Sequence, residues 1–313
     1  MDLHAERIEC AMPDGPPVSG MRLGPVEVFL GAQSGKFPDG NQVIVRGSDA
    51  MAVFDTPMVA NRIATRLADA DLVILGHVHE DHAAGLHLLP HVPLHVPRAD
   101  VDAIRSLDGL RRHYGYSPGV VDAMVERART DFHFVPRPDA LAYDDGATWE
   151  LGGLRVRAIH MPGHTAGHSV LLIEPLGIAF IGDIDLSSFG PYYGDACSDL
   201  GAFRRTLTRM LDLPARAWIT SHHKGIVMER AGFSAQLERF AAVIERRDEA
   251  LLAALREQPA TLEELAARRF VYPPSFNDLF VPDVERRVAL QHLEALIGSG
   301  RVERRGAHYA AMA

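Results

Sequence analysis

The sequence predicts an α/β protein that is followed by a smaller C-terminal domain made mostly of helices. Up to about residue 230, short apolar stretches rich in β-branched residues alternate with turns and a few helical segments, as expected of sheets covered by helices. Beyond residue 230 the pattern changes to amphipathic helices with a period of about 3.6 residues. We therefore predict one domain over residues 1–230 and a second over residues 231–313.

Several short apolar stretches of the first domain are typical of β-strands, because they alternate partly and are bounded by Gly, Pro, Asp or Asn. In chain order they span residues 25–31, 41–47, 50–56, 71–77, 154–161, 168–174, 177–183 and 216–222. Helices are predicted over residues 58–70, 98–129 and 198–213. For the last helix we expect Ser198 as the N-cap and an apolar face of Leu200, Phe203, Leu207 and Leu211.

The second domain is predicted to contain helices followed by a hairpin. A long amphipathic helix covers residues 232–257, and a short helix begins with a capping box from Thr261 to Glu264. Another helix spans residues 283–300, and residues 301–312 form a small hairpin. This order of elements is typical of a winged-helix-like domain.

The composition argues against several classes of protein. A formal net charge of -9 disfavours a broad nucleic-acid-binding surface. Only two cysteines occur, so a disulfide-rich secreted protein is not expected. Residues 1–20 lack the apolar core of a signal peptide, and the most apolar stretch, residues 169–184, is broken by Pro175 and Gly177. We therefore expect a cytoplasmic protein without a membrane segment.

Histidines and aspartates gather where predicted strands end. They are His77, His79, Asp81 and His82 after the strand at 71–77, His164 and His168 after 154–161, Asp183 at the end of 177–183, and His222 and His223 at the end of 216–222. Sites in open α/β sheets are built at the carboxyl ends of strands, so we expect these side chains to lie together.

This set of side chains predicts a metal site. Residues two apart in extended backbone project to the same side, so His77 and His79 can bind one cation together. Asp81 and His82 follow where the chain turns into a helix, and they can reach a second cation nearby. Imidazole nitrogen suits zinc, carboxylate oxygen suits a harder or shared ion, and Asp183 could bridge the two ions.

The motif His77-Val-His79-Glu-Asp81-His82 resembles the HxHxDH signature of the metallo-β-lactamase superfamily, and the later histidines and Asp183 follow in matching order between about residues 20 and 230. The resemblance implies an αββα sandwich with two metal ions, zinc by preference and manganese or iron as alternatives. The implied ligands are His77, His79 and His164 on the first ion, Asp81, His82 and the last histidine on the second, and Asp183 as the bridge. Counting from the strand favours His222 over His223 as the last histidine. Asp81 and Asp183 are also the candidate catalytic residues.

Other residues are candidates for supporting or substrate-binding roles. Asp55 resembles the family's strand-end aspartate, which supports the ligand loops. His168 and His223 are also expected to support the metal ligands without binding the metal themselves. Tyr192, Tyr193 and Lys224 are candidates for contact with the substrate.

The resemblance implies a hydrolase that uses a metal-bridging hydroxide, and we expect it to cleave a small acyl substrate, a thioester or an ester. Lactonases of the superfamily carry a tyrosine where Leu186 stands, which argues against a lactone. Aspartate in place of cysteine at position 183 argues against a true zinc β-lactamase.

Other functions stay open. A phosphodiesterase or single-strand ribonuclease could use the same two-metal site, although the acidic balance disfavours a polyanion. A mononuclear iron sulfur dioxygenase is another enzyme reading, and a metal-binding sensor with negligible turnover belongs to a different class. The expected partner is a small molecule. For the C-terminal domain we expect a role as a lid or as the interface of a homodimer, and not as a nucleic-acid reader.

Overall fold

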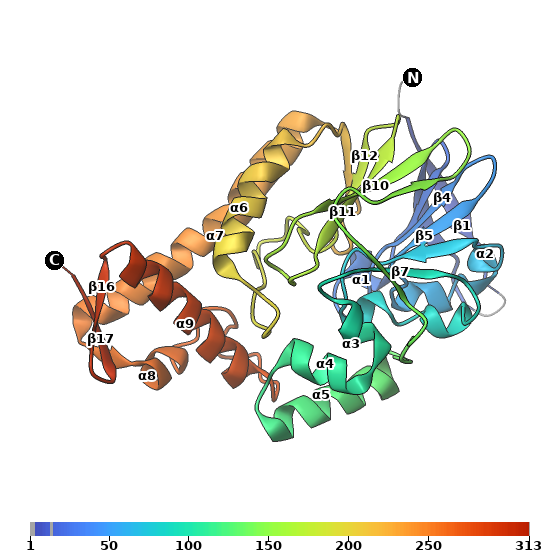
Figure 1. The fold of residues 1–313 in the computed structure, drawn as a ribbon. Helices are drawn as coiled ribbons and strands as arrows, with labels where there is room; N and C mark the ends of the chain where they lie inside the picture. The colour runs from blue at the N-terminus through green and yellow to red at the C-terminus, as the bar shows by residue number, and fades with distance from the viewer. Residues whose placement is uncertain (1–3, 13–14, 313) are drawn as a thin grey trace.

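Two β-sheets pack face to face in the computed structural model, which describes residues 4–12 and 15–312 (Figure 1). The first sheet has eight strands in chain order. They are β1 (Ala5–Cys10), β2 (Val18–Leu23), β3 (Val26–Phe29), β4 (Gln42–Arg46), β5 (Met51–Phe54), β6 (Leu72–Ile74), β7 (Leu94–Pro97) and β8 (Leu141–Tyr143). Strands β1 to β5 pair antiparallel and strands β5 to β8 pair parallel.

The second sheet has six strands in the order β14-β13-β12-β11-β10-β9. They are β9 (Thr148–Glu150), β10 (Arg155–His160), β11 (Ser169–Glu174), β12 (Ile178–Phe180), β13 (Ala217–Ile219) and β14 (Ile226–Val227). Only β12 and β13 pair parallel. Helices lie on the outer faces of both sheets, so the predicted αββα sandwich is confirmed.

Alternation within the strands builds the core between the sheets. Val43 and Val45 of β4 face the other sheet, whereas Ile44 between them faces the outer helices. Across the interface, the rings of Phe54 in β5 and Phe180 in β12 lie 5.9 Å apart. Full burial of such side chains contributes about 1.5–3 kcal/mol each, so this interface holds the strand ends, and the loops that follow them, at fixed positions.

The predicted helices of the first domain are shorter than expected or divided. Residues 58–70 contain a 3₁₀ turn, η1 (Met58–Asn61), and one turn of helix, α2 (Ala64–Leu67). The predicted segment 98–129 is divided into α3 (Val101–Arg105), α4 (Leu107–Tyr114) and α5 (Pro118–Asp131), which we call the helical insert. The division after α4 occurs because Gly115 takes a left-handed conformation with φ of 58°. Short helical turns also occur at α1 (Ala32–Gly35), η2 (Glu80–His82) and η3 (Leu86–Leu88).

Two predictions for helix α6 (Leu200–Arg209) were wrong. The N-cap is Asp199, whose side chain accepts from the backbone N–H of Ala202, whereas the Ser198 hydroxyl donates to the carbonyl oxygen of His164. Leu211 is 49% exposed, because the helix tightens into the 3₁₀ turn η4 (Met210–Asp212) and Met210 takes the buried position.

The predicted strands are all present, but β1, β2, β7, β8, β9 and β14 were not predicted. Most of them are short, and β8 and β9 contain three residues each. Strand β1 is mostly exposed. Strands so short or so exposed carry no apolar alternation from which they could be recognised.

The C-terminal part contains the predicted helices and hairpin in the predicted order, together with the short strand β15, which was not predicted. They are α7 (Arg230–Glu257), β15 (Ala260–Thr261), α8 (Leu262–Ala266), α9 (Val281–Gly298), β16 (Val302–Arg305) and β17 (His308–Ala311), with sheet order β15-β17-β16. The capping box from Thr261 to Glu264 is present. The winged-helix assignment itself stays a prediction. Among the described residues, no helix is both long and apolar enough to cross a lipid bilayer.

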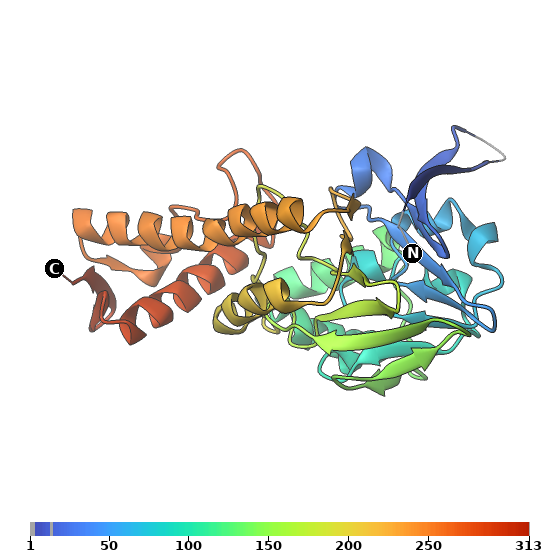
Figure 2. The ribbon, with the colours of Figure 1, turned by 90° about the horizontal axis from the view of Figure 1, so that it is seen from above.

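Helix α7 belongs to both parts of the molecule and projects from the sandwich toward the C-terminal elements (Figure 2). Its first half packs on the second sheet, where Phe233 stacks on Trp218 of β13 with ring centroids 4.1 Å apart. Its last turns, with Leu251 and Leu255, pack in the small C-terminal core. The predicted boundary at residue 230 coincides with the start of α7, but the change from one core to the other occurs inside this helix.

Candidate metal centre

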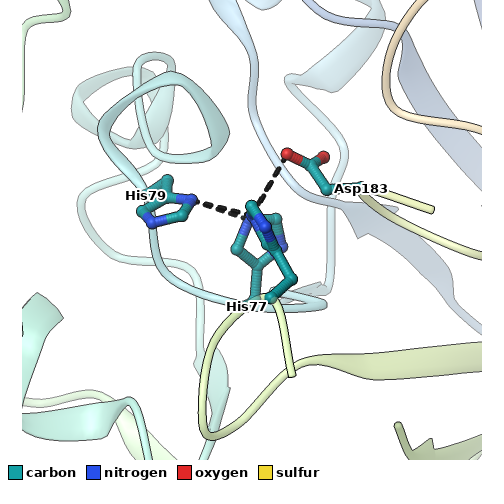
Figure 3. Close-up of side chains that lie close together, drawn as sticks. His77, His79 and Asp183 are labelled. Atoms are coloured by element: carbon teal, nitrogen blue, oxygen red, sulfur yellow. Dashed lines mark hydrogen bonds and ion pairs between the residues drawn. The ribbon is translucent and has the colours of Figure 1, made fainter. Parts of the chain in front are cut away.

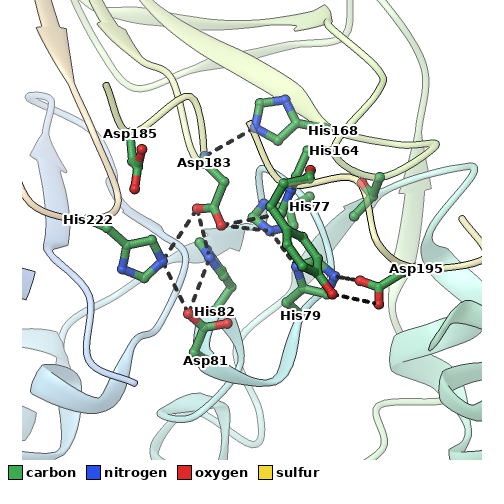
Figure 4. A network of polar contacts seen from close by, with 12 residues as sticks. His77, His79, Asp81, His82, His164, His168, Asp183, Asp185, Asp195 and His222 are labelled. Carbon is green, nitrogen blue, oxygen red and sulfur yellow. Dashed lines mark hydrogen bonds and ion pairs between the residues drawn. The ribbon is translucent and has the colours of Figure 1, made fainter. Parts of the chain in front are cut away.

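Loops after β6, β10, β12 and β13 bring the candidate ligands together (Figure 4). The loop after β12 requires a glycine before Asp183. Gly182 has φ of 54°, and a Cβ atom there would lie 2.6 Å from Nε2 of His168. This close turn places the carboxylate of Asp183 among the histidines.

The first ligand set is formed by the residues that the resemblance assigned to the first ion. His77 Nε2 lies 3.2 Å and His164 Nε2 lies 3.0 Å from Nδ1 of His79 (Figure 3). Asp183 Oδ2 lies 3.2 Å from His164 Nε2 and 4.0 Å from His77 Nε2. The three imidazole rings are buried. Their inner nitrogens and the facing carboxylate oxygen are therefore shielded from water.

Contacts on the outer side of these rings fix where the protons lie. His164 Nδ1 lies 2.9 Å from the carbonyl oxygen of Tyr192, which can only accept. His79 Nε2 lies 2.9 Å from Oδ2 of Asp195. Each outer nitrogen therefore donates, and the neutral ring presents a lone pair on its inner nitrogen. Lone pairs converging on one point are the arrangement that a cation requires.

The second ligand set repeats this arrangement with different supports. His222 Nδ1 lies 2.8 Å and 2.9 Å from the carbonyl oxygens of Gly35 and Asp39, so Nε2 carries the lone pair when the ring is neutral. That Nε2 atom lies 3.2 Å from Asp81 Oδ2. His82 Nδ1 lies 2.7 Å from Asp55 Oδ2, which directs the other ring nitrogen of His82 inward.

Asp183 lies between the two sets, and each of its oxygens faces one of them (Figure 4). Oδ2 faces His164, whereas Oδ1 lies 3.1 Å from His82 Nε2 and 3.5 Å from His222 Nε2. The Oδ1 and His82 Nε2 atoms are buried and have no hydrogen-bond partner among the described residues. Acceptors buried opposite acceptors are costly unless a cation lies between them, so the donor set suits two metal ions that share Asp183.

The electrostatics of the protein alone indicate the same demand for positive charge. Burial opposes a charge on His222, but Asp183 and Asp81 outweigh it and raise the pKa of His222 to about 10. Burial also opposes a charge on His79, and the hydrogen bond with Asp195 raises its pKa to about 9. In His77, burial and the neighbouring His82 lower the pKa well below its usual value. The carboxylates therefore create a strongly negative site, which favours divalent cations.

Two predicted supporting residues contact the ligands directly. Asp55 accepts from the backbone N–H of Gly76 through Oδ1, at 2.7 Å, and holds His82 through Oδ2. His168 donates from Nδ1 to the carbonyl oxygen of Met161 and accepts from the backbone N–H of Asp183. Burial and the nearby His164 lower the pKa of His168 to about 3, so its ring stays neutral and can accept this bond.

The two adjacent histidines after β13 point to different places. His222 lies in the second ligand set, whereas His223 has φ of 56° and its Nε2 faces Asp185 Oδ2 at 3.7 Å. Its side chain is 35% exposed, so it lies beside the cluster and is not a member of it. Lys224 is exposed, and its backbone N–H donates to the carbonyl oxygen of His222 at 2.8 Å.

The two adjacent tyrosines after β12 also differ. Tyr192 is half-buried, and its ring centroid lies 5.8 Å from that of His164, beside the first ligand set. Tyr193 does not suit its predicted role in substrate binding, because it is fully buried on the opposite side of the loop. Its hydroxyl group is already used by Arg247, at 3.0 Å, and by His292, at 2.8 Å.

Three further residues near the ligands were not predicted to support them. Asp195 holds His79, Tyr116 donates to Asp195, and Tyr114 donates to Oε2 of the buried Glu80 at 2.6 Å. Asp195 stands in an irregular loop, and both tyrosines come from the helical insert, so no spacing relates them to the histidines.

Two surface cavities formed by the described residues lie outside the ligand cluster. One of about 510 Å³ lies at α5 and includes His87 and His133 in its lining. The other, of about 280 Å³, lies between the loop at Phe189 and the buried Arg247 of α7. Neither lining includes a candidate ligand, so we place the chemistry at the ligand cluster, where the donor atoms converge.

Comparison with protein families agrees with this geometry. The family described as the metallo-beta-lactamase superfamily matches residues 36–222, which is more than half of the chain and contains all the candidate ligands. The chain belongs to the metallo-beta-lactamase superfamily. Its fold and its histidine-rich loops are therefore those of this superfamily, while the C-terminal elements lie beyond the matched residues.

Curated relatives include two hydrolases. An atrochrysone carboxyl ACP thioesterase of Pseudocercospora fijiensis is 25% identical over 293 residues, which cover 87% of this chain and 74% of the relative. A hydroxyacylglutathione hydrolase of Methylococcus capsulatus is 28% identical over 250 residues, which cover 78% of this chain and 84% of the relative. These relatives support metal-dependent hydrolysis at the level of the superfamily.

Two solved structures resemble most of the chain. A metallo-beta-lactamase family protein from Thermus thermophilus has a TM-score of 0.65 at 25% identity, with coverage of 87% of this chain and 94% of that protein. A beta-lactamase domain protein from Burkholderia ambifaria has the same TM-score of 0.65 at 18% identity, with coverage of 94% and 93%. The second likeness shows the fold alone.

Proposed function

We propose that the protein is a hydrolase that holds two divalent metal ions and cleaves a small thioester or ester. The observation that carries this proposal is the pair of inward-facing ligand sets on either side of Asp183. Zinc suits the imidazole and carboxylate donors best, and manganese or iron would accept the same atoms. The hydrolases among the relatives support the reaction class.

Two divalent cations bound there would supply a water molecule with a pKa lowered to about 7 and would polarise the acyl carbonyl group. The residues of the chain position these groups. Asp81 and Asp183, the proposed catalytic residues, direct their carboxylate oxygens into the cluster, and His222 is oriented by two backbone carbonyl oxygens. Asp55 orients His82 in the same way.

A covalent route through a cysteine is not indicated. Burial raises the pKa of the Cys197 thiol well above its usual value, and the nearby Asp195 and Asp100 raise it further. A thiol that stays protonated is a poor nucleophile. We therefore propose direct attack by water without an acyl-enzyme.

The surroundings of the first ligand set support an acyl substrate. Tyr192 lies beside His164, and Tyr116 lies next to Phe280 of the C-terminal part, with ring centroids 6.3 Å apart. Phe280 in turn contacts Tyr272, at 5.8 Å between ring centroids. Aromatic side chains of this kind would pack on an apolar acyl group. Two of the relatives, an ACP thioesterase and a hydroxyacylglutathione hydrolase, favour a thioester.

We further propose that the C-terminal part forms a wall of the substrate site and does not read nucleic acid. Arg287 of α9 donates to the carbonyl oxygens of Tyr114 and Gly115, at 2.9 Å and 2.6 Å, in the helical insert. The Arg287 side chain therefore joins α9 to the helical insert. The net charge of -9 also opposes a long polyanion, which would need many free basic groups.

A substrate screen on one purified sample tests this function. Acyl-glutathione, acyl-coenzyme A and short acyl thioesters are compared with an aryl ester, a lactone, a bis-aryl phosphodiester and single-stranded RNA, and metal content is measured on the same protein. We expect thioester hydrolysis with two bound metal ions. An Asp183→Asn variant, purified in parallel, controls for contaminating hydrolases.

Each alternative has its own result in this screen. Salt-sensitive cleavage of RNA with inert thioesters would support the ribonuclease. A persulfide is added to the screen for the dioxygenase, which one iron per chain and oxidation of that persulfide would support. Two bound metal ions without turnover on any substrate would support a metal-binding sensor.

A further inference from the structure

Asp195 connects the first ligand set to two tyrosines. It is 1% exposed and uses both of its carboxylate oxygens. Oδ2 accepts from Nε2 of His79 at 2.9 Å (Figure 4). Oδ1 accepts from the hydroxyl of Tyr116 and from the hydroxyl of Tyr192, the latter at 3.2 Å. The two hydroxyl oxygens lie 3.1 Å apart. Asp195 is thus a fully hydrogen-bonded buried carboxylate.

The bond to His79 determines what that ring presents to the ligand set. A carboxylate that accepts from Nε2 keeps the proton on that nitrogen, so Nδ1 carries the lone pair that faces His77 and His164. It also limits rotation of the ring. On the other side of the cluster, Asp55 performs the same function for His82.

The partners of Asp195 come from segments that are far apart in the sequence. Tyr192 and Asp195 belong to the loop after β12, whereas Tyr116 follows α4 in the helical insert. The backbone N–H of Ala196 donates to the carbonyl oxygen of Tyr114 at 2.9 Å, which joins the loop to the insert. Tyr116 also lies against Phe280 at the start of α9. The helical insert and the loop after β12 therefore meet at Asp195, and α9 begins beside Tyr116.

We propose that Asp195 is a positioning residue for His79, and that Tyr116 and Tyr192 hold its carboxylate in the orientation that the first metal position needs. The contact between the helical insert and the loop after β12 then determines how tightly that metal position binds its ion. The proposal rests on the proposed metal centre, because it concerns the affinity of one of its two positions. It assigns no contact between Asp195 and the substrate.

The first test measures metal affinity in the full-length chain, by titration of the metal-free protein with Co²⁺ and by competition with a chelator for Zn²⁺. In Asp195→Asn and Asp195→Ala, we expect the affinity for one of the two ions to fall by about 10–100-fold, with the other unchanged. Asp55→Asn should weaken the other ion, so the two variants together assign the two positions. The absorption bands of bound Co²⁺ should change in Asp195→Asn, because the geometry at one ion changes.

The second test examines the tyrosines. Tyr116→Phe and Tyr192→Phe each remove one hydrogen bond to Asp195, and we expect each to weaken the same ion that Asp195→Asn weakens. Combined with Asp195→Asn, either substitution should add little, because both act through one carboxylate. Tyr193→Phe is the matched control, since it removes a buried hydroxyl from the adjacent position without touching Asp195. It should leave both metal affinities unchanged.

The results separate this proposal from the proposed function. A wild-type chain that binds fewer than two ions would count against the metal centre itself. If the wild-type chain binds two ions, and Asp195→Ala binds both with an affinity within about 2-fold of wild type, the positioning role is wrong. Additive losses from Asp195→Asn and Tyr116→Phe would show that the tyrosine acts elsewhere. Thermal melting of every variant separates these outcomes from a general loss of folding.

Discussion

His82 and Asp183 follow strands of different sheets and face each other, with Nε2 of the histidine 3.1 Å from Oδ1 of the aspartate. His82 follows β6 of the first sheet, and Asp183 follows β12 of the second. Because Asp55 occupies the other nitrogen of His82, both facing atoms carry lone pairs when the ring is neutral, as it must be to bind a metal ion. Packing of one sheet on the other therefore creates a demand for a cation that neither sheet has alone.

The metal content follows from this geometry. Protein purified without chelator and reconstituted should contain two divalent metal ions per chain, by elemental analysis. Removing them should lower the melting temperature, because a ligand that binds only the folded state stabilises it. One equivalent or less after reconstitution would contradict the two-metal centre.

Replacing Asp183 by asparagine should reduce kcat/KM by more than about 100-fold, which exceeds the 10–100-fold loss typical of a residue that supports a ligand. The reason is that each of its oxygens faces a different ligand set. Activity is measured on the best substrate of the screen, together with metal content. Asp212→Asn, at an exposed position in η4, should keep full activity. A near-normal rate in Asp183→Asn would exclude a shared carboxylate.

Asp248 of α7 should stabilise the contact between the two parts of the chain. It is buried and bonds to His292 of α9 and Arg204 of α6, each at 2.5 Å. We expect Asp248→Asn to lower the free energy of unfolding by about 1–3 kcal/mol at pH 7, since it leaves buried donors with a weaker acceptor. Glu249→Gln, at the exposed neighbouring position, is the control and should change stability little.

The effect of Asp248→Asn should depend on pH in a defined direction. Burial pushes the pKa of Asp248 upward, but the hydrogen bond from His292 and the charges nearby outweigh it, so the pKa lies below its usual value. A carboxyl group with a lowered pKa stabilises the folded state above its unfolded-state value of about 3.9 and loses this contribution as pH falls through its folded-state value. The difference in free energy of unfolding between wild type and Asp248→Asn should therefore be largest near pH 7 and should become small below about pH 4. A difference that grew on acidification would contradict this account.

Truncation after Glu229 should damage the catalytic domain. It would remove α7 and expose the surface on which Phe233, Leu237 and Phe240 pack, and full burial of such a side chain is worth about 1.5–3 kcal/mol. We expect a lower melting temperature or insoluble protein. An RNA gel shift on the intact chain should show no binding. A truncated chain that melts normally and loses only RNA binding would instead indicate a nucleic-acid-binding module.

Local spacing determined much of this site from the sequence. His77 and His79 alternate in extended backbone, Asp81 and His82 follow in the next turn, and Asp183 ends a buried strand. The strands that precede these ligands also carry the apolar residues that place them in the sandwich. Short-range periodicity therefore predicted the α/β class and the gathering of the candidate ligands at strand ends, because each depends on near neighbours or on the ends of regular strands. The superfamily, the αββα sandwich and the assignment of ligands to two ions came from the resemblance of residues 77–82 to the HxHxDH signature.

Only the tertiary structure decided between neighbours with the same side chain. Tyr192 lies beside His164 while Tyr193 bonds to α7 and α9, because consecutive residues of an irregular loop point in directions that only the packed loop defines. The positive φ of His223 likewise turns its ring away from the position of His222. Asp195 acquires its role from His79 and Tyr116, which lie on other segments of the chain. No pattern in a single sequence encodes these contacts between distant segments, because the packing of the sheets, the helical insert and the C-terminal helices determines them.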